Sequence, residues 1–191
     1  MSGINSFSNV IFFKSLFKPI FSFFRNAWKK FYEIVDADGG VISWKYVVLL
    51  LNLQSNQTFH LANKLTPDHI YFENQIMKVF LAAQIFSLSV ANAIDHCREN
   101  LKIPGFEDSA ATSRFLRMFN DLFDLLNSSS KFGAWSKAPL SVTNTGYWRD
   151  TFREGAAYIK GLTLASGLLV NRFNSLILPF YFCKYAETQV S

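Results

Sequence analysis

Cysteine is scarce in this sequence of 191 residues, which has only Cys97 and Cys183 and no CxxC pair. This scarcity excludes a cysteine-rich zinc finger and a disulfide-stapled scaffold, and it favours a reducing compartment. Charged residues are also few, at 17%, whereas half of the residues are hydrophobic and 21 are Phe. Disordered chains have the opposite composition, so we predict one folded domain with a substantial core.

Neither of two long apolar stretches has the composition of a membrane span. Lys14, Lys18 and Pro19 interrupt residues 10–24, which also lack the small-residue cleavage site of a signal peptide. Residues 162–182 carry Arg172 near their centre, where a charge costs about 2.5–3.5 kcal/mol on insertion scales. We therefore predict a buried helix there. The Phe- and Lys-rich N-terminus leaves an amphipathic, membrane-associated protein as an alternative.

Several signatures of well-known sites are missing. The sequence has no GxxxxGK[ST] loop and no GxSxG elbow, and its three histidines lack the spacing of metal ligands. We predict that His69 lies at a helix terminus or is partly buried. The net charge of +5 fits an anionic partner, whether nucleotide, nucleic acid or membrane, but an ordinary basic globular domain would carry the same charge.

Apolar residues recur at intervals of three and four residues, and alternating strand patterns are scarce. These features predict an all-α fold, a single domain of about five to seven helices. Ser43 and Thr66 are expected to cap helices, Asp36–Gly40 and Pro104-Gly105 to form turns, and residues 128–146 to form a loop. The expected helices cover Phe12–Val35, Trp44–Gln54, a start at Pro67, Gln75–Glu99, a segment from Asp108 or Ser109 to Asn127, Tyr147–Lys160 and Leu162–Tyr185.

The segment Phe123-Asp124-Leu125-Leu126-Asn127 can present a ring, a carboxylate and an amide on one helix face. A carboxylate accepts hydrogen bonds from both guanine N1–H and the exocyclic amine, which adenine cannot reproduce, and such a bidentate contact discriminates bases by roughly 1–3 kcal/mol. A phenyl ring can stack on the base. The alternative is an amphipathic helix whose Phe123 simply belongs to the core.

Lys64 and Lys78 are candidate phosphate contacts, because a lysine serves phosphate as a point charge without a strict geometry. Lys78 falls in the first turn of a predicted helix, where free backbone N–H groups such as that of Val79 favour an anion. Each lysine could instead be an ordinary solvated surface residue.

Three blocks keep their order and spacing: KLTPDHI at residues 64–70, MKVFLAAQIFSLSVANAI at 77–94 and FLRMFNDLFDLLN at 115–127. Together they resemble the GTP-binding insertion domain of P-element-type transposases. In that family the nucleotide supports assembly on DNA and is not hydrolysed for energy. The resemblance implies GTP, accompanied by Mg²⁺, as the ligand. It implies these nucleotide-binding residues: Lys64, Lys78, Val79, Ser87, Phe123, Asp124 and Asn127. On a continuous helix Ser87 would lie about half a turn away from Lys78.

The flanks resemble only part of the family's RNase H-like catalytic core. Arg25-Asn26 matches the end of a DxxHLLKxxRN-like segment, but Leu16, Pro19 and Ser22 stand at its Asp, His and Lys positions. Two-metal phosphoryl transfer needs carboxylates that converge on the metal ions, and Leu16 stands where the carboxylate of this segment should be. We therefore expect no catalytic residues, no metal ligands and no enzymatic activity. We assign residues 1–35 to a degenerate core remnant, 36–160 to the insertion-like domain, and 161–191 to an apolar helix returning towards the core.

The resemblance also implies partners and a location. The expected protein partners are further copies of this chain or intact transposase subunits. DNA is expected to be bound only indirectly, and no membrane is expected as a partner. The expected location is the nucleus, with the cytoplasm as the alternative. The competing functional class is a helical structural or protein-interaction domain that has lost nucleotide binding.

Overall fold

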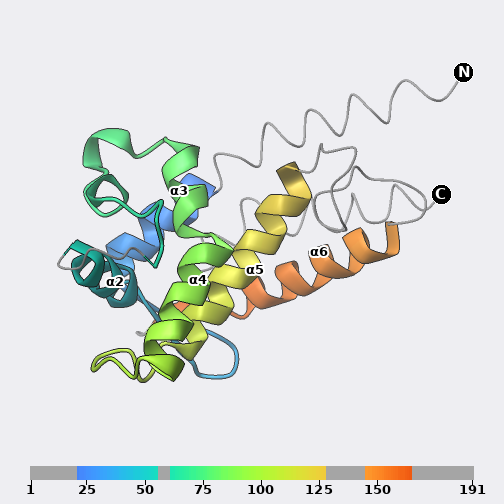
Figure 1. Cartoon of the computed structure of the whole chain (residues 1–191). Helices are drawn as coiled ribbons and strands as arrows, with labels where there is room; N and C mark the ends of the chain where they lie inside the picture. Colours follow the sequence, from blue (N-terminus) through green and yellow to red (C-terminus); the bar gives the residue numbers. More distant parts are fainter. Residues whose placement is uncertain (1–20, 56–60, 128–144, 165–191) are drawn as a thin grey trace, which may run out of the picture.

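A computed structural model of the protein describes residues 21–55, 61–127 and 145–164 (Figure 1). Residues 21–31 form a helix, called here the 21–31 helix. The other helices are α2 (Lys45–Ser55), the 3-10 turns η1 (Pro67–His69) and η2 (Glu73–Gln75), α3 (Val79–Ile85), α4 (Leu88–Asp95), the π-helical turn η3 (His96–Asn100), α5 (Ala110–Asn127) and α6 (Thr145–Lys160). The strands are β1 (Glu33–Val35), β2 (Val41–Ser43) and β3 (Thr163–Leu164).

A three-stranded antiparallel sheet corrects the all-α prediction, although the described chain is mostly helical. The strand order is β2-β1-β3, with Val35 opposite Val41 on one side and opposite Thr163 on the other. β-Branched residues suit a half-buried strand and crowd a helix. Consequently the predicted helix Phe12–Val35 gives way to β1 at its end, and the predicted helix Leu162–Tyr185 begins as β3. Residues 165–191 lie outside the described part.

The predicted turn at Asp36–Gly40 is confirmed, and it joins β1 to β2. The Asp36 carboxylate accepts hydrogen bonds from the backbone N–H groups of Asp38 (3.1 Å) and Gly40 (2.8 Å). A Cβ at Gly40 would stand 2.8 Å from Cβ of Ala111, so only glycine allows this approach to α5. Arg114 on α5 completes the attachment through an ion pair with Asp36 at 2.6 Å.

The single long helix predicted over Gln75–Glu99 is broken in the structure. α3 ends at Ile85, Ser87 has extended backbone (φ −109°, ψ 150°), and α4 starts at Leu88. Among the described residues one run, Val79–Asn100, passes a length-and-composition test for a membrane span, but 44% of its most apolar window is buried inside the protein. A core helix passes the same test, and this run packs against α5.

Aromatic rings make the centre of the core. Trp28 of the 21–31 helix is fully buried, and its ring centroid lies 5.0 Å from that of Trp44, 5.1 Å from that of Phe115 and 6.1 Å from that of Phe86. These partners come from the end of β2, from α5 and from the break between α3 and α4. One side chain therefore joins most of the fold.

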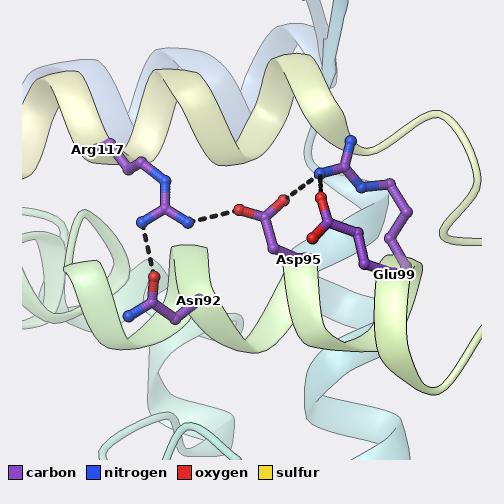
Figure 2. A network of polar contacts seen from close by, with 5 residues as sticks. Asn92, Asp95, Glu99 and Arg117 are labelled. Carbon is purple, nitrogen blue, oxygen red and sulfur yellow. Dashed lines mark hydrogen bonds and ion pairs between the residues drawn. The ribbon is translucent and has the colours of Figure 1, made fainter.

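Helices α4 and α5 lie side by side (Figure 1), and polar contacts cross between them at their surface. Figure 2 shows Arg117 of α5 donating to Asn92 of α4 at 2.6 Å and pairing with Asp95. Asp95 also pairs with Arg98 at 2.7 Å. Together with the apolar contacts beneath, these bonds set how α4 runs along α5.

Candidate functional site

The base-reading face predicted on α5 lies in the C-terminal half of that helix. Phe123 is half-buried and packs edge-on against Phe21 of the 21–31 helix, with ring centroids 5.1 Å apart and planes at 88°. Asp124 is half-buried beside it. Asn127 is the last residue of α5, and its side chain lies outside the described part. Phe123 therefore shares its ring with the core while part of the ring stays open to solvent.

The break between α3 and α4 brings Ser87 to the same part of α5. The Leu88 N–H donates to the side-chain oxygen of Asn120 at 3.1 Å, and Phe86 stacks on Phe119 with ring centroids 4.8 Å apart. Asn120 precedes Phe123 and Asp124 by three and four residues, so all three lie on one face of α5. The residue after Ser87 is thus bonded to α5 one turn before Phe123 and Asp124.

The Ser87 hydroxyl is already committed to the helix break. It donates to the carbonyl oxygen of Gln84 at 2.7 Å and accepts from the backbone N–H of Val90 at 3.4 Å. A hydroxyl has one donor and two acceptor positions. Ser87 can therefore accept from a ligand's hydroxyl or N–H, but it can donate to a phosphate only by giving up Gln84.

Lys78 and Val79 lie at the other end of α3. Lys78 is the N-cap residue, and its exposed ammonium has no hydrogen bond or ion pair with any described residue. Because α3 has only seven residues, its short backbone dipole adds little, and the lysine charge is the main attraction for an anion at this position.

Lys64 lies in an exposed turn before η1, and it too has no polar partner among the described residues. That turn is fixed to α3 by His69, whose Nε2 lies 2.8 Å from the Gln84 side-chain oxygen and whose Nδ1 lies 2.9 Å from the Thr66 hydroxyl. His69 is buried at the end of η1. The prediction of a histidine at a helix terminus is confirmed, and the side chain is more deeply buried than the predicted alternative of partial burial.

The predicted site residues lie at the two ends of α3, which has seven residues and is therefore about 10 Å long. Lys78 lies at one end, and Ser87 lies at the other, next to the part of α5 that carries Phe123 and Asp124. The turn that carries Lys64 is joined through His69 to Gln84, the second-last residue of α3. On a continuous helix Ser87 would point away from Lys78, but the helix breaks after Ile85, so this geometry does not apply. The structure brings together the elements that carry the seven predicted residues, and the contact of each residue with a ligand stays a prediction.

Sequence reasoning missed the polar residues that hold these elements in place. They are Arg25 and Asn26 on the 21–31 helix, Gln84 on α3 and Asn120 on α5. Asn120 had a local signal, because it shares the Phe123 and Asp124 face and asparagine is a weak helix former. Arg25 and Asn26 match the end of a family segment, but no local pattern shows what Arg25 holds, since its backbone carbonyl partners are about 50 residues away in the chain.

A hollow of about 690 Å³ lies elsewhere, between β2, the start of α2 and the start of α5. None of the seven predicted residues lines it. Its charged walls mix Lys45 and Arg114 with Glu33, Glu107 and Asp108, so it has no net preference for an anion. Within the described residues no three His, Cys, Asp or Glu side chains gather in a way that could hold a metal ion.

Comparison with known proteins identifies the family. The family model described as "TNP-like, GTP-binding insertion domain" matches residues 20–139. DNA transposase THAP9 from Homo sapiens is 32% identical over 116 residues, which are 61% of this chain and 12% of that protein. The chain therefore spans only a small part of this curated relative. The predicted boundaries at residues 35 and 160 stay predictions.

A solved structure shares the fold. The Drosophila P element transposase strand transfer complex matches with a TM-score of 0.71 at 18% identity, and the match covers 91% of this chain and 39% of that chain. The family model covers more than half of the sequence, and the human relative and the structural neighbour are both transposases. The chain belongs to the TNP-like, GTP-binding insertion domain family of P-element-type transposases.

Proposed function

We propose that this domain binds GTP between the start of α3 and the C-terminal half of α5, and that it has no transposase activity of its own. The observation that carries the proposal is the helix break at Ser87, held on α5 by Asn120 (3.1 Å to the Leu88 nitrogen). The break brings the start of α4 onto α5, and His69 joins the block at residues 64–70 to α3 through Gln84. These two contacts support a site shared by the three sequence blocks. Family membership supplies the ligand class.

Each residue has a role that suits its chemistry. Asp124 accepts from guanine N1–H and the exocyclic amine, and the exposed part of the Phe123 ring packs on the base. Asn127 adds an amide one turn further along α5. Lys64, Lys78 and the Val79 N–H hold the phosphates, with Mg²⁺ as their companion ion, and Ser87 accepts from the ribose or the base.

Catalytic inactivity is proposed on the residues of the flanks. Leu16 and Pro19, which replace the family's Asp and His, precede the described residues, and Ser22 at the lysine position is fully buried in the 21–31 helix. None of these side chains can bind a divalent metal as a carboxylate does. Binding without strand transfer is the function that these residues support.

Calorimetric titration of GTP and ATP tests the proposal. We expect GTP to bind and ATP to bind at least about tenfold more weakly, because adenine lacks both donors that Asp124 recognises. Asp124→Ala should remove this preference. Asp121→Ala is the matched control, since Asp121 is an exposed carboxylate one turn earlier on α5.

Inosine triphosphate, which lacks the exocyclic amine, separates base reading from general binding. The wild-type domain should bind it about tenfold more weakly than GTP, and Asp124→Ala should bind the two alike. Equal affinity of the wild-type domain for GTP and ATP, no binding of either, or normal GTP binding by Asp124→Ala would each refute the proposed function.

A protein-interaction domain is the second candidate, and an exposed apolar group favours it. Tyr71, Met77 and Phe80 are 70%, 67% and 66% exposed, with Ile76 at 50%. Exposed apolar groups of this kind mark interaction surfaces. Size-exclusion chromatography with and without GTP discriminates the two candidates, because oligomers that form without nucleotide and ignore GTP favour the interaction function.

A further inference from the structure

Arg25 is a fully buried arginine in the 21–31 helix, and its whole guanidinium group faces the segment that leads into α3. Nη2 donates to the carbonyl oxygen of Ile76 at 2.7 Å and, more weakly, to that of Gln75 at 3.5 Å. Nη1 donates to the carbonyl oxygen of Lys78 at 3.3 Å. Three backbone positions immediately before α3 are thus held by one side chain.

Asn26 and Phe72 fix the orientation of that guanidinium. The Asn26 side-chain oxygen accepts from Nε at 3.1 Å and from Nη2 at 2.9 Å, while its own amide donates to Ile76 at 3.1 Å. The ring of Phe72 lies under the guanidinium carbon, 3.8 Å from it. A planar fork that stacks on a ring and donates along its edge is a geometry that lysine cannot reproduce.

No carboxylate among the described residues pairs with Arg25. Burial lowers the pKa of Arg25 to about 10, which still leaves the side chain charged at neutral pH. A buried charge without a counter-ion is destabilising unless hydrogen bonds compensate it. Carbonyl oxygens of residues 75–78 supply that compensation, so the segment and the arginine hold each other in place.

We propose that Arg25 is a positioning residue for nucleotide phosphates: it fixes the backbone of residues 75–78 and thereby places the Lys78 ammonium at the start of α3. This inference rests on the proposed function. Arg25 is fully buried, so it acts through Lys78 and not by direct contact with a ligand. The base-reading end, at Phe123 and Asp124, is separated from it by the length of α3.

The position of Arg25 predicts which ligands should respond to its loss. Arg25→Lys keeps a positive charge but cannot serve three carbonyls. We expect it to weaken GTP binding by about tenfold and guanosine binding by less than about twofold, because guanosine has no phosphate for Lys78. In a Lys78→Ala background, Arg25→Lys should have less than about a twofold further effect on GTP, as coupled residues are not additive.

Amide hydrogen exchange gives a readout that needs no nucleotide. The Lys78 N–H donates to the Gln75 carbonyl at 3.0 Å, and in Arg25→Lys its exchange should accelerate by about tenfold while amides in the middle of α5 do not change. Asn26→Ala, which removes no buried charge, should give the same pattern more weakly. Lys30→Ala, an exposed cation on the same helix, is the control and should change neither exchange nor affinity.

The outcomes separate the two proposals. Unchanged exchange at Lys78 in both variants overturns the positioning role, whether or not GTP binds. Equal losses of GTP and guanosine affinity, or additive losses with Lys78→Ala, also overturn it, because they indicate general loosening of the fold. Failure of the wild-type domain to bind GTP refutes the proposed function and the phosphate role, and accelerated exchange would then show Arg25 as a purely structural clamp.

Discussion

Single residues near the candidate site have structural duties that can be separated from ligand binding. The Ser87 hydroxyl donates to the carbonyl oxygen of Gln84 at the end of α3 and accepts from the N–H of Val90 at the start of α4. Lys64 and Lys78 have no such duty, since both are exposed and neither ammonium has a hydrogen bond or ion pair with a described residue. Substitutions at the lysines should therefore report on ligand binding, whereas a substitution at Ser87 reports mainly on the fold.

Ser87→Ala should lower the free energy of unfolding by about 1 kcal/mol, the usual cost of losing an N-cap. Its effect on GTP affinity should stay below about threefold, because the hydroxyl offers a ligand only an acceptor position. Urea denaturation and calorimetry measure the two quantities. Ser89→Ala, at an exposed position two residues later in α4, should leave both unchanged. A large affinity loss with unchanged stability would contradict this expectation.

At the scale of elements, α5 is the helix on which the other parts are placed. The β1–β2 turn is attached to its N-terminal half by the ion pair between Asp36 and Arg114. The break between α3 and α4 is attached to its C-terminal half by the hydrogen bond to Asn120. Along its length α4 packs on one side, and α6 also packs against it. The contact with α6 is close, because a Cβ at Gly155 would stand 2.7 Å from a methyl carbon of Leu122.

Gly155→Ala should destabilise the protein by about 1–2 kcal/mol, because Leu122 is buried and cannot yield without overpacking. Gly146→Ala in the same helix has nothing within 4 Å of the added Cβ. It should stabilise by about 0.5–1 kcal/mol, since alanine loses less conformational entropy in a helix. Thermal or urea unfolding of the two variants makes the comparison. A Gly155→Ala variant as stable as the wild-type protein, or more stable, would show that α6 does not pack on Leu122 as described.

At the scale of the whole molecule, residues far apart in sequence close the fold. β3 at Thr163–Leu164 pairs with β1 at residues 34–35, and Trp28 packs against rings from three other parts of the chain. Since the same core supports the sheet, the helix break and α5, we expect the described part to unfold as one cooperative unit.

Trp28→Ala should cost about 3–5 kcal/mol, as removal of a large buried ring does, which is a large share of a total stability of about 5–15 kcal/mol. Phe31→Ala, at an exposed position on the same helix, should cost less than about 1 kcal/mol. Far-UV circular dichroism and tryptophan fluorescence should follow one transition in the wild-type protein. Two separated transitions would show that the sheet and the helices unfold independently.

Local sequence patterns were enough to predict the long helices. The bounds of α5 and α6 were close to those expected, because a long amphipathic period and a flanking turn are local features. The sheet was missed because its strands have only two or three residues, too few to show alternation. A signal was present, however: β-branched residues flank the Asp36–Gly40 turn, the pattern of a hairpin.

By itself the sequence determined the mostly helical character, the family and the set of residue types that suit a guanine nucleotide. Periodicity, block order and side-chain chemistry can all be read along the chain. Only the tertiary structure decided where the long helix breaks and what holds the start of α3. Phe86 turns at the break because it stacks on Phe119, and residues 75–78 are held by Arg25 from about 50 residues away. Contacts between distant residues have no local period, so they become visible only once the chain has folded.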